Sequence, residues 1–361
     1  MKNKLLLTTA IVSGLTFGGS AMSQTTITGG MDLAFKSHSY DAAGGVASKR
    51  GFGRETQVNI ANKGKLVNGM EYAAGFSLEF DGQPRASASG AEAMTAGNEV
   101  GSISNEGVYI NVTPIAGTTI HVGVDSIQNS TRTVPQVLEV LDHVAAGLGM
   151  GARNTVGANP KENMGVGIIQ VIPSTGLTAS YLYTPNGGDF GLNDQNADGT
   201  TNHRNSAYEF GVVGTDTAGI KGLGVFYFQN KEDKSREGGT DLIDKEGKSY
   251  GISYSMSGVT AGYSLHKSNR NASAATSVAD VDTSAKTYAL TYALTKDITV
   301  GATRMTNNSD GGASSERINA IQLGYNLGPV SLAISAADAA GIGYVNNADA
   351  KEIGARLTAR F

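Results

Sequence analysis

Residues 69–81 read GMEYAAGFSLEFD, and apolar and polar side chains alternate along the whole stretch. One set of alternate positions contains Met70, Tyr72, Ala74, Phe76, Leu78 and Phe80. The other set contains Glu71, Glu79 and Asp81. Successive side chains of a β-strand point to opposite sides of the sheet, so a period of two predicts a strand with one apolar and one polar face.

The same alternation recurs along the rest of the chain, for example in TITGGMDLAFK (26–36) and in EIGARLTARF (352–361). In total the sequence predicts sixteen strands, of which RINAIQLGYN (317–326) fits only with a change of phase near Ala320. No break in composition interrupts the series. Residues 24–361 are therefore predicted to form one domain.

The connections between these strands alternate in length. Seven are short and turn-like: KLVNG, PIAG, IPSTG, TDTAGIKG, SG, KD and LG. The others are long and polar, such as QNKEDKSREGGTDLIDKEGKS at 229–249. An even number of antiparallel strands with tight turns at one end and long loops at the other is typical of bacterial outer-membrane barrels. The predicted fold is all-β, an up-and-down transmembrane barrel of sixteen strands with short periplasmic turns and long extracellular loops.

The width of such a barrel decides which face contacts lipid. Sixteen tilted strands give a cylinder roughly 30–35 Å across, which apolar side chains could not fill. We therefore expect the apolar faces to contact lipid and the charged faces to line water, with a soluble β-sandwich or solenoid as the alternative. In the last strand, Ile353, Leu357 and Phe361 would then face lipid, while Arg356 and Arg360 would face the lumen. That strand would close the barrel by pairing with the first.

The N-terminus has the features of a secretory signal peptide. Two lysines precede the apolar run LLLTTAIVSGLTF at 5–17, and small residues lead up to Ser23. We expect cleavage after Ser23, so that residues 1–23 are removed and residues 24–361 form the mature protein. A transmembrane anchor fits less well, because the apolar run is short and contains Thr, Ser and Gly.

Composition and scattered polar residues argue against several other functions. The chain has no cysteine, which excludes a disulfide framework and a thiolate metal site. Its net charge of −4 argues against nucleic acid as a partner. The five histidines show neither metal-ligand spacing nor a nucleophile motif, so we expect no metal, no cofactor and no enzymatic activity. A calcium-like stretch at 194–205 places Asn205 where a calcium loop needs Glu, so a polar loop is the preferred interpretation.

With these features the sequence resembles the general porins of Gram-negative bacteria. The resemblance covers residues 24–361 and is carried by the sixteen-strand rhythm, by RGFGRETQVNI at 50–60, by the alternating connections and by the terminal Phe361. It implies a homotrimer in outer-membrane lipid that acts as a passive channel for small hydrophilic solutes and ions. It also implies that Phe361 belongs to the signal read by the barrel assembly machinery.

The resemblance further implies that the third long loop, about 128–162, folds back into the lumen. The residues Val137, Leu138, Val140, Leu141 and Val144 recur there at helical spacing. Glu139 and Asp142 lie on the other side of that helix. We expect the apolar side to contact the barrel wall and the two acids to point into the channel. The alternative is an exposed extracellular helix.

A basic wall opposite those acids would complete a constriction. Strand parity predicts Lys36, Lys49, Arg356 and Arg360 on the lumen face, and Arg153 lies on the return from the loop. Lys49 matches a wall arginine of the porin family, judged from the shared stretch. Opposed charges in a narrow aqueous gap create a transverse field that orients polar solutes.

Ion preference stays open at this stage, because the acids Glu55, Glu71 and Asp125 are predicted on the same lumen face. Two other functions also stay open. One is a solute-selective channel of the same fold. The other is a surface adhesin or phage receptor in which the long loops matter more than the pore.

Overall fold

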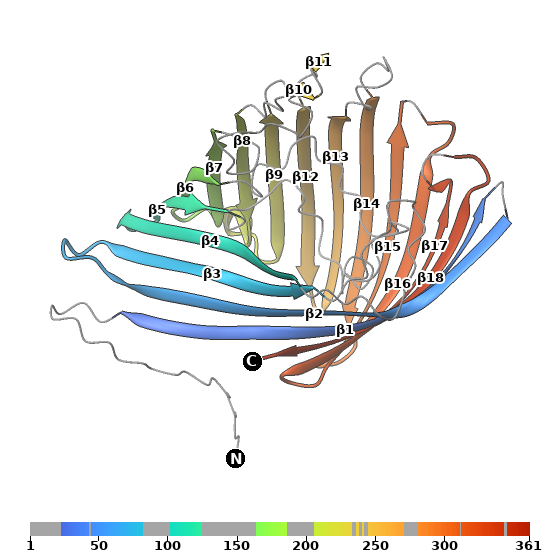
Figure 1. Ribbon diagram of the computed structural model, residues 1–361, viewed down its shortest axis with the longest axis horizontal. Coiled ribbons are helices and arrows are strands. Elements are labelled where there is room, and N and C mark those ends of the chain that lie inside the picture. Colours follow the sequence, from blue (N-terminus) through green and yellow to red (C-terminus); the bar gives the residue numbers. More distant parts are fainter. Residues whose placement is uncertain are drawn as a thin grey trace.

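Sixteen strands are hydrogen-bonded into a closed antiparallel barrel (Figure 1). The computed structural model describes residues 23–42, 45–81, 102–124, 164–185, 206–232, 236–237, 240–241, 245–270, 281–310, 312–342 and 345–361. The first half of the barrel contains β1 (Gln24–Ala42), β2 (Gly45–Lys65), β3 (Glu71–Asp81), β4 (Ser102–Ile115), β5 (Thr118–Gly123), β6 (Gly165–Ile172), β7 (Leu177–Thr184) and β8 (Ala207–Gly214). The second half contains β9 (Leu223–Glu232), β12 (Lys245–Met256), β13 (Val259–Arg270), β14 (Val281–Ala293), β15 (Ile298–Ser309), β16 (Glu316–Asn326), β17 (Val330–Ala340) and β18 (Asp349–Arg360).

Two further elements are short. β10 (Arg236–Glu237) and β11 (Thr240–Asp241) form a separate two-stranded sheet beyond the ends of β9 and β12 (Figure 1). A three-residue 3-10 helix, η2 (Thr217–Gly219), lies in the turn between β8 and β9. Within the described ranges, no helix is long and apolar enough to cross a membrane.

Each predicted strand has a counterpart in the barrel, so the sixteen-stranded fold is confirmed. The main difference lies in strand length. The second strand begins at Gly45, ahead of the stretch RGFGRETQVNI at 50–60, because its ladder with β1 continues as far as the pair Ala42 and Gly45. Lys49 therefore lies within β2.

The predicted change of phase near Ala320 is wrong. Burial alternates without interruption along β16: Ile318, Ala320 and Gln322 are buried, while Asn319 and Ile321 between them are exposed. The pairings of β16 with β15 and β17 contain no bulge. Ile318 thus faces the inside of the barrel, where it joins other buried apolar side chains.

The two faces of the wall differ as predicted. Large exposed apolar side chains lie on the outer face, among them Leu33, Val166, Ile252, Leu290, Ile334 and Leu357. The buried inner face contains many polar side chains, among them Asp32, His121, Glu209, Asn230, Thr287 and Glu352. The apolar face therefore points outward and the polar face inward, as in a barrel surrounded by lipid.

The barrel closes where β18 pairs with β1. The amide of Gly29 donates a hydrogen bond of 2.8 Å to the carbonyl of Phe361, and the amide of Phe361 donates one of 3.0 Å back to Gly29. A Cβ atom at Gly29 would lie 2.6 Å from the Phe361 ring, and one at Gly30 would overlap the Arg360 side chain. The two glycines thus make room for one large side chain on each face of the closing strand.

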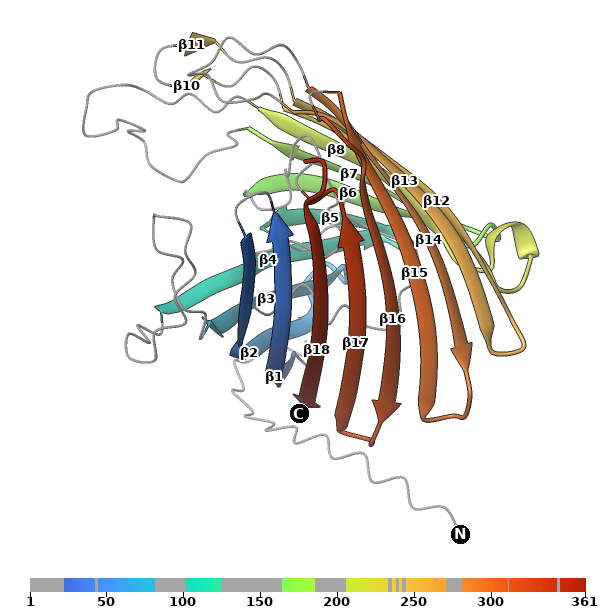
Figure 2. The ribbon, with the colours of Figure 1, turned by 90° about the vertical axis from the view of Figure 1, so that its right-hand side faces the viewer.

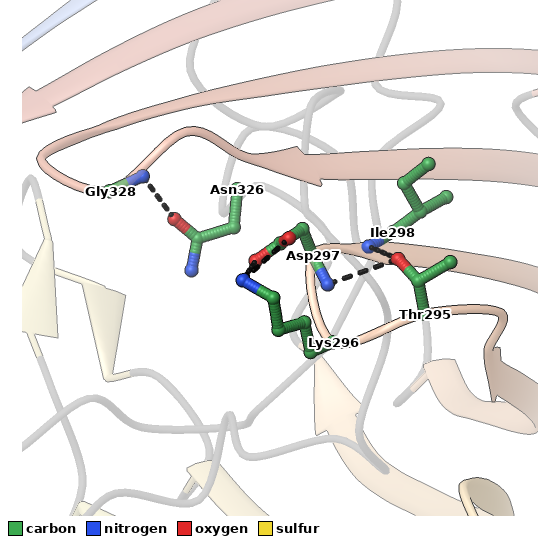
Figure 3. Close-up of polar contacts among 6 residues, drawn as sticks. All are labelled: Thr295, Lys296, Asp297, Ile298, Asn326 and Gly328. Carbon is green, nitrogen blue, oxygen red and sulfur yellow. Dashed lines mark hydrogen bonds and ion pairs between the residues drawn. The ribbon is translucent and has the colours of Figure 1, made fainter. Parts of the chain in front are cut away.

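Side-chain caps stabilise the short turns (Figure 3). In the β14–β15 turn, the Thr295 hydroxyl accepts hydrogen bonds from the amides of Asp297 (3.2 Å) and Ile298 (3.0 Å). In the β16–β17 turn, the amide of Gly328 donates to the Asn326 side-chain oxygen at 2.9 Å. These turns lie at the same end of the barrel as the C-terminus (Figure 2). Short turns mark the periplasmic end of such barrels.

Candidate functional site: the lumen

Two of the predicted lumen cations lie on the inner face of β18. Arg356 is half-buried and faces the same side as its neighbours Ala34 and Ala333. Arg360 is 62% exposed, and its guanidinium lies 3.8 Å from a carboxylate oxygen of Asp32, whose side chain is only 7% exposed. At this separation the pair is a weak, partly hydrated ion pair that places opposite charges side by side on the lumen wall.

The other predicted cations are less fully described. The backbone of Lys36 lies in β1, opposite Gly354, and that of Lys49 lies in β2, opposite His38. His38 is in turn opposite Glu352, whose side chain is buried on the inner face. Register thus places both lysines on inward positions, while their side chains lie outside the described residues. Arg153, Glu139 and Asp142 also lie outside the described residues.

The register of the first three strands forms an acidic row that was not foreseen. Asp32 on β1 is paired with Glu55 on β2, and Glu55 is paired with Asp81 on β3. Register thus places Glu55 and Asp81 at positions on the same side of the sheet as Asp32, while their side chains lie outside the described residues. Glu55 was expected on the lumen face by strand parity, but its alignment with Asp32 and Asp81 depends on pairing between distant segments.

Further carboxylates lie on the inner face of β8, β16 and β18. Glu209, Glu316 and Glu352 are each no more than 2% exposed. The Asn307 amide on β15 donates a 2.8 Å hydrogen bond to a carboxylate oxygen of Glu316 on β16. The described inner wall is therefore as rich in acidic as in basic positions.

One part of the inner wall is apolar. Met305, Ile318, Ala320, Ala337, Ala339, Ile342, Ala348 and Ala350 form a buried cluster. Its members lie on the inner face of β15–β18 and in the connection between β17 and β18. The cluster is located towards the long-loop end of these strands, because Met305, Ile318, Ala339 and Ala350 are neighbours near that end of the ladder.

The polar groups of the lumen are distributed as in a channel and do not converge on one point. Its charged and polar groups are spread around the wall on many strands. In the part of the chain that the structure describes, no three His, Asp or Glu side chains are placed to hold a metal ion. Fixed charges around an aqueous passage act on solutes through their field and through hydrogen bonds.

Solved structures share this architecture. Salmonella typhi OmpF, solved in complex with daunomycin, aligns over 94% of this chain and 98% of its own, with a TM-score of 0.62 and 11% identity. OmpT of Vibrio cholerae aligns over 93% of this chain and 98% of its own, with a TM-score of 0.56 and 12% identity. A multiply substituted porin from Rh. blastica covers 93% of this chain and 100% of its own, with a TM-score of 0.56 and 13% identity. At these identities the likeness shows the fold.

The family is shown by sequence. None of the curated proteins matches this chain significantly. The profile of the Gram-negative porin family, in contrast, matches residues 8–358. The chain therefore belongs to the Gram-negative porin family and forms an outer-membrane channel for the passive diffusion of solutes.

Proposed function

We propose that the protein is a general diffusion channel for small hydrophilic solutes and ions, and not one built for a single solute. The observation that carries this proposal is the closed barrel whose outer face is apolar and whose inner face carries polar and charged side chains on many strands. Charges distributed in this way favour hydrated solutes in general, because no single constellation of polar groups matches one ligand.

We propose that residues 128–162 fold into the lumen and narrow it. The apolar inner cluster on β15–β18 supports this, because its side chains are buried on the lumen side of the wall, where apolar groups gain stability by contact with other apolar groups. The valines and leucines between Val137 and Val144 would supply the matching apolar side. Glu139 and Asp142 would then face the channel, across from the basic positions.

Those basic positions are Lys36, Lys49, Arg153, Arg356 and Arg360. Register places Asp32, Glu55 and Asp81 in one row on the same wall, and we expect their carboxylates to offset part of that positive charge. With two further acids on the loop, we propose a modest preference of the pore for cations.

Three finer properties follow from family membership and stand as proposals. The chain forms a homotrimer in the outer membrane. Residues 1–23 are a signal peptide that is cleaved during export. Phe361, which packs on Gly29 at the closing seam, is part of the signal read by the barrel assembly machinery.

Planar-bilayer recording tests the channel and its stoichiometry together. Purified protein is expected to insert in conductance steps, commonly in groups of three. The reversal potential under a potassium chloride gradient then reports charge preference. Electrically silent insertion would refute the channel, and conductance that saturates with one solute would replace a general channel with a selective one.

A double substitution tests the constriction. Glu139→Gln with Asp142→Asn is expected to shift the reversal potential toward anions, because it removes two negative charges from the proposed narrowest point. The matched control is Asp216→Asn with Asp297→Asn, which removes two carboxylates from the short turns. If both double variants give the wild-type reversal potential, Glu139 and Asp142 do not line the narrowest point.

A further inference from the structure

A bulge in β4 turns one aromatic side chain toward the lumen. On the long-loop side of the bulge, β4 pairs in step with β3 as far as the pair of Glu106 with Ser77. The next pair is Tyr109 with Gly75, which lies three residues farther along β4 but only two along β3. The extra residue reverses the alternation of β4, so Tyr109 projects inward, while its neighbour Ile110 is 55% exposed on the apolar outer face.

Gly107 lies at this bulge and allows its backbone conformation. The φ of Gly107 is +60°, in the left-handed region that favours glycine, and a Cβ atom there would lie 3.1 Å from the Ser77 hydroxyl oxygen. A β-bulge re-aims the side chains that follow it, and bulges are over-represented beside functional sites. Without the extra residue, Tyr109 would lie on the outer face. The inward direction of Tyr109 is therefore fixed by the backbone of β4.

The Tyr109 side chain lies over a glycine of the neighbouring strand; β3, β4 and β5 run side by side in Figure 1. A Cβ atom at Gly75 would lie 3.1 Å from both Cε1 and the hydroxyl oxygen of Tyr109. One face of the ring thus lies against the wall, and the half-buried ring turns its other face to the lumen. Phe226 and Phe228, on the inner face of β9, are only 8% and 0% exposed, so neither offers a free face.

The described side chains next to the ring are neutral and polar. On the periplasmic side, Asn111 follows on the same face of β4, and its Oδ1 lies 2.7 Å from Nδ1 of His121, a hydrogen bond that orients the amide. On the long-loop side, Asn59 of β2 is paired with Ser77 of β3. Ser77 is buried and Asn59 is half-buried. Amides and a hydroxyl thus flank the free face of the Tyr109 ring.

We propose that Tyr109 is a stacking platform for pyranose sugars on the wall of the channel. The C–H face of the sugar lies on the ring, and its hydroxyl groups reach Asn59 and Ser77. An aromatic face with a few placed polar groups is the usual composition of a small-molecule site. Gly75 and Ala61 are paired inward residues of β3 and β2, and both are small, so the sugar has room beside the ring.

This platform lies within the lumen and not at its mouth. Tyr109 is six residues from Ile115, the periplasmic end of β4, which is about 20 Å along the strand. The inference rests on the proposed function, because a solute meets Tyr109 only inside a water-filled channel. One stacked ring and a few hydrogen bonds give a dissociation constant on the order of 10 mM. Such a site delays a sugar and leaves the channel open to ions.

Charge near the ring favours a neutral solute over an organic cation. Register places Glu106 opposite Ser77, although the side chain of Glu106 lies outside the described residues. On the periplasmic side, the exposed Lys63 lies on the same face of β2 as Asn59. The face of a tyrosine ring also attracts cations. Lys63 opposes that attraction, so the groups around Tyr109 match hydroxyls better than an ammonium.

The test titrates open channels in a planar bilayer with D-glucose and, as the matched solute, with sorbitol, which has the same carbon chain without the ring. Glucose is expected to reduce the potassium chloride conductance to a plateau, and sorbitol only in proportion to its concentration. Tyr109→Leu keeps an apolar side chain over Gly75 and is expected to weaken glucose binding about five-fold. Tyr109→Phe keeps the ring and should change it less than about two-fold. Tyr183→Leu, at an outward tyrosine that is 42% exposed, is the control and should bind as the wild type does.

The outcomes separate this site from the channel itself. Absence of conductance would refute channel and platform together, whereas a conducting channel that responds alike to glucose and sorbitol would overturn the platform alone. Wild-type glucose affinity in a conducting Tyr109→Leu variant would also overturn it. If that variant does not assemble, Asn59→Ala replaces it, with an expected loss of about five-fold, and an unchanged affinity again overturns the proposal. A stronger saturating block by choline than by glucose would show an organic-cation site and overturn the assignment to sugars.

Discussion

Ile353 and Leu357 face outward from β18, whereas Glu352 and Arg356 face inward from the same strand. Each of these charged residues is thus the sequence neighbour of an apolar one, and both have the same strand conformation. A strand does not by itself distinguish the two sides, so the environment on each side selects the residues. On the inner face, a charged side chain can contact lumen water or polar neighbours. Outside, the same charge would have to enter hydrocarbon.

The most severe test of this difference exchanges charge between the two faces. Leu357→Arg places a cation in the middle of the outward apolar series of β18, and we expect it to lower the free energy of unfolding by about 2–4 kcal/mol. Arg356→Leu makes the converse change on the adjacent inward position, and we expect a loss below about 1 kcal/mol. Urea unfolding of the barrel refolded into lipid vesicles, followed by tyrosine fluorescence and by gel mobility, measures both.

Leu357→Met is the size-matched control, since it keeps an apolar side chain of similar volume and should change stability by less than about 1.5 kcal/mol. If Leu357→Arg were as stable as Arg356→Leu, the outward face of β18 would not be in contact with lipid.

At the closing seam between β1 and β18, we expect a substitution to lower stability by a smaller amount. Gly29→Ala would bring a methyl group to 2.6 Å from the Phe361 ring and 2.7 Å from the carbonyl oxygen of Gln57. Overpacking of this kind lowers stability by about 1–3 kcal/mol. A double-mutant cycle with Phe361→Ala separates the two contacts, and we expect the second substitution to recover part of the loss. Additive effects of the two substitutions would show that the ring does not press on residue 29.

The contrast between the faces was readable from the sequence, whereas the alignment of residues across strands was not. Alternation in segments such as 69–81 predicts each strand and its two faces, because the period of two is a local property. The change of phase predicted near Ala320 is wrong, because β16 alternates without interruption and its inward Ile318 belongs to the apolar cluster inside β15–β18.

Register is set by turn lengths and by pairing between distant segments, which no local pattern contains. The row of Asp32, Glu55 and Asp81 on the inner wall emerges only from the pairing of β1, β2 and β3. The same holds for the inward direction of Tyr109, which depends on the extra residue of β4 opposite β3. Both features depend on pairing across strands, and both needed the structure.

The finest test of the two faces makes one substitution on each side of the wall. Asp32→Asn removes an inward carboxylate from a pair with an exposed arginine at 3.8 Å, so its effect on stability is at most about 1 kcal/mol. Its effect on permeation should be clearer: the lumen loses a negative charge and Arg360 loses its partner, so the reversal potential under a salt gradient shifts toward anions. Asp338→Asn removes an outward, exposed carboxylate of the same chemistry. It should leave the reversal potential unchanged, because the wall and its water-filled interior separate and screen that charge from the permeating ions. If both variants shifted the reversal potential equally, ion selectivity would depend only on the net charge of the protein and not on the face on which a carboxylate lies.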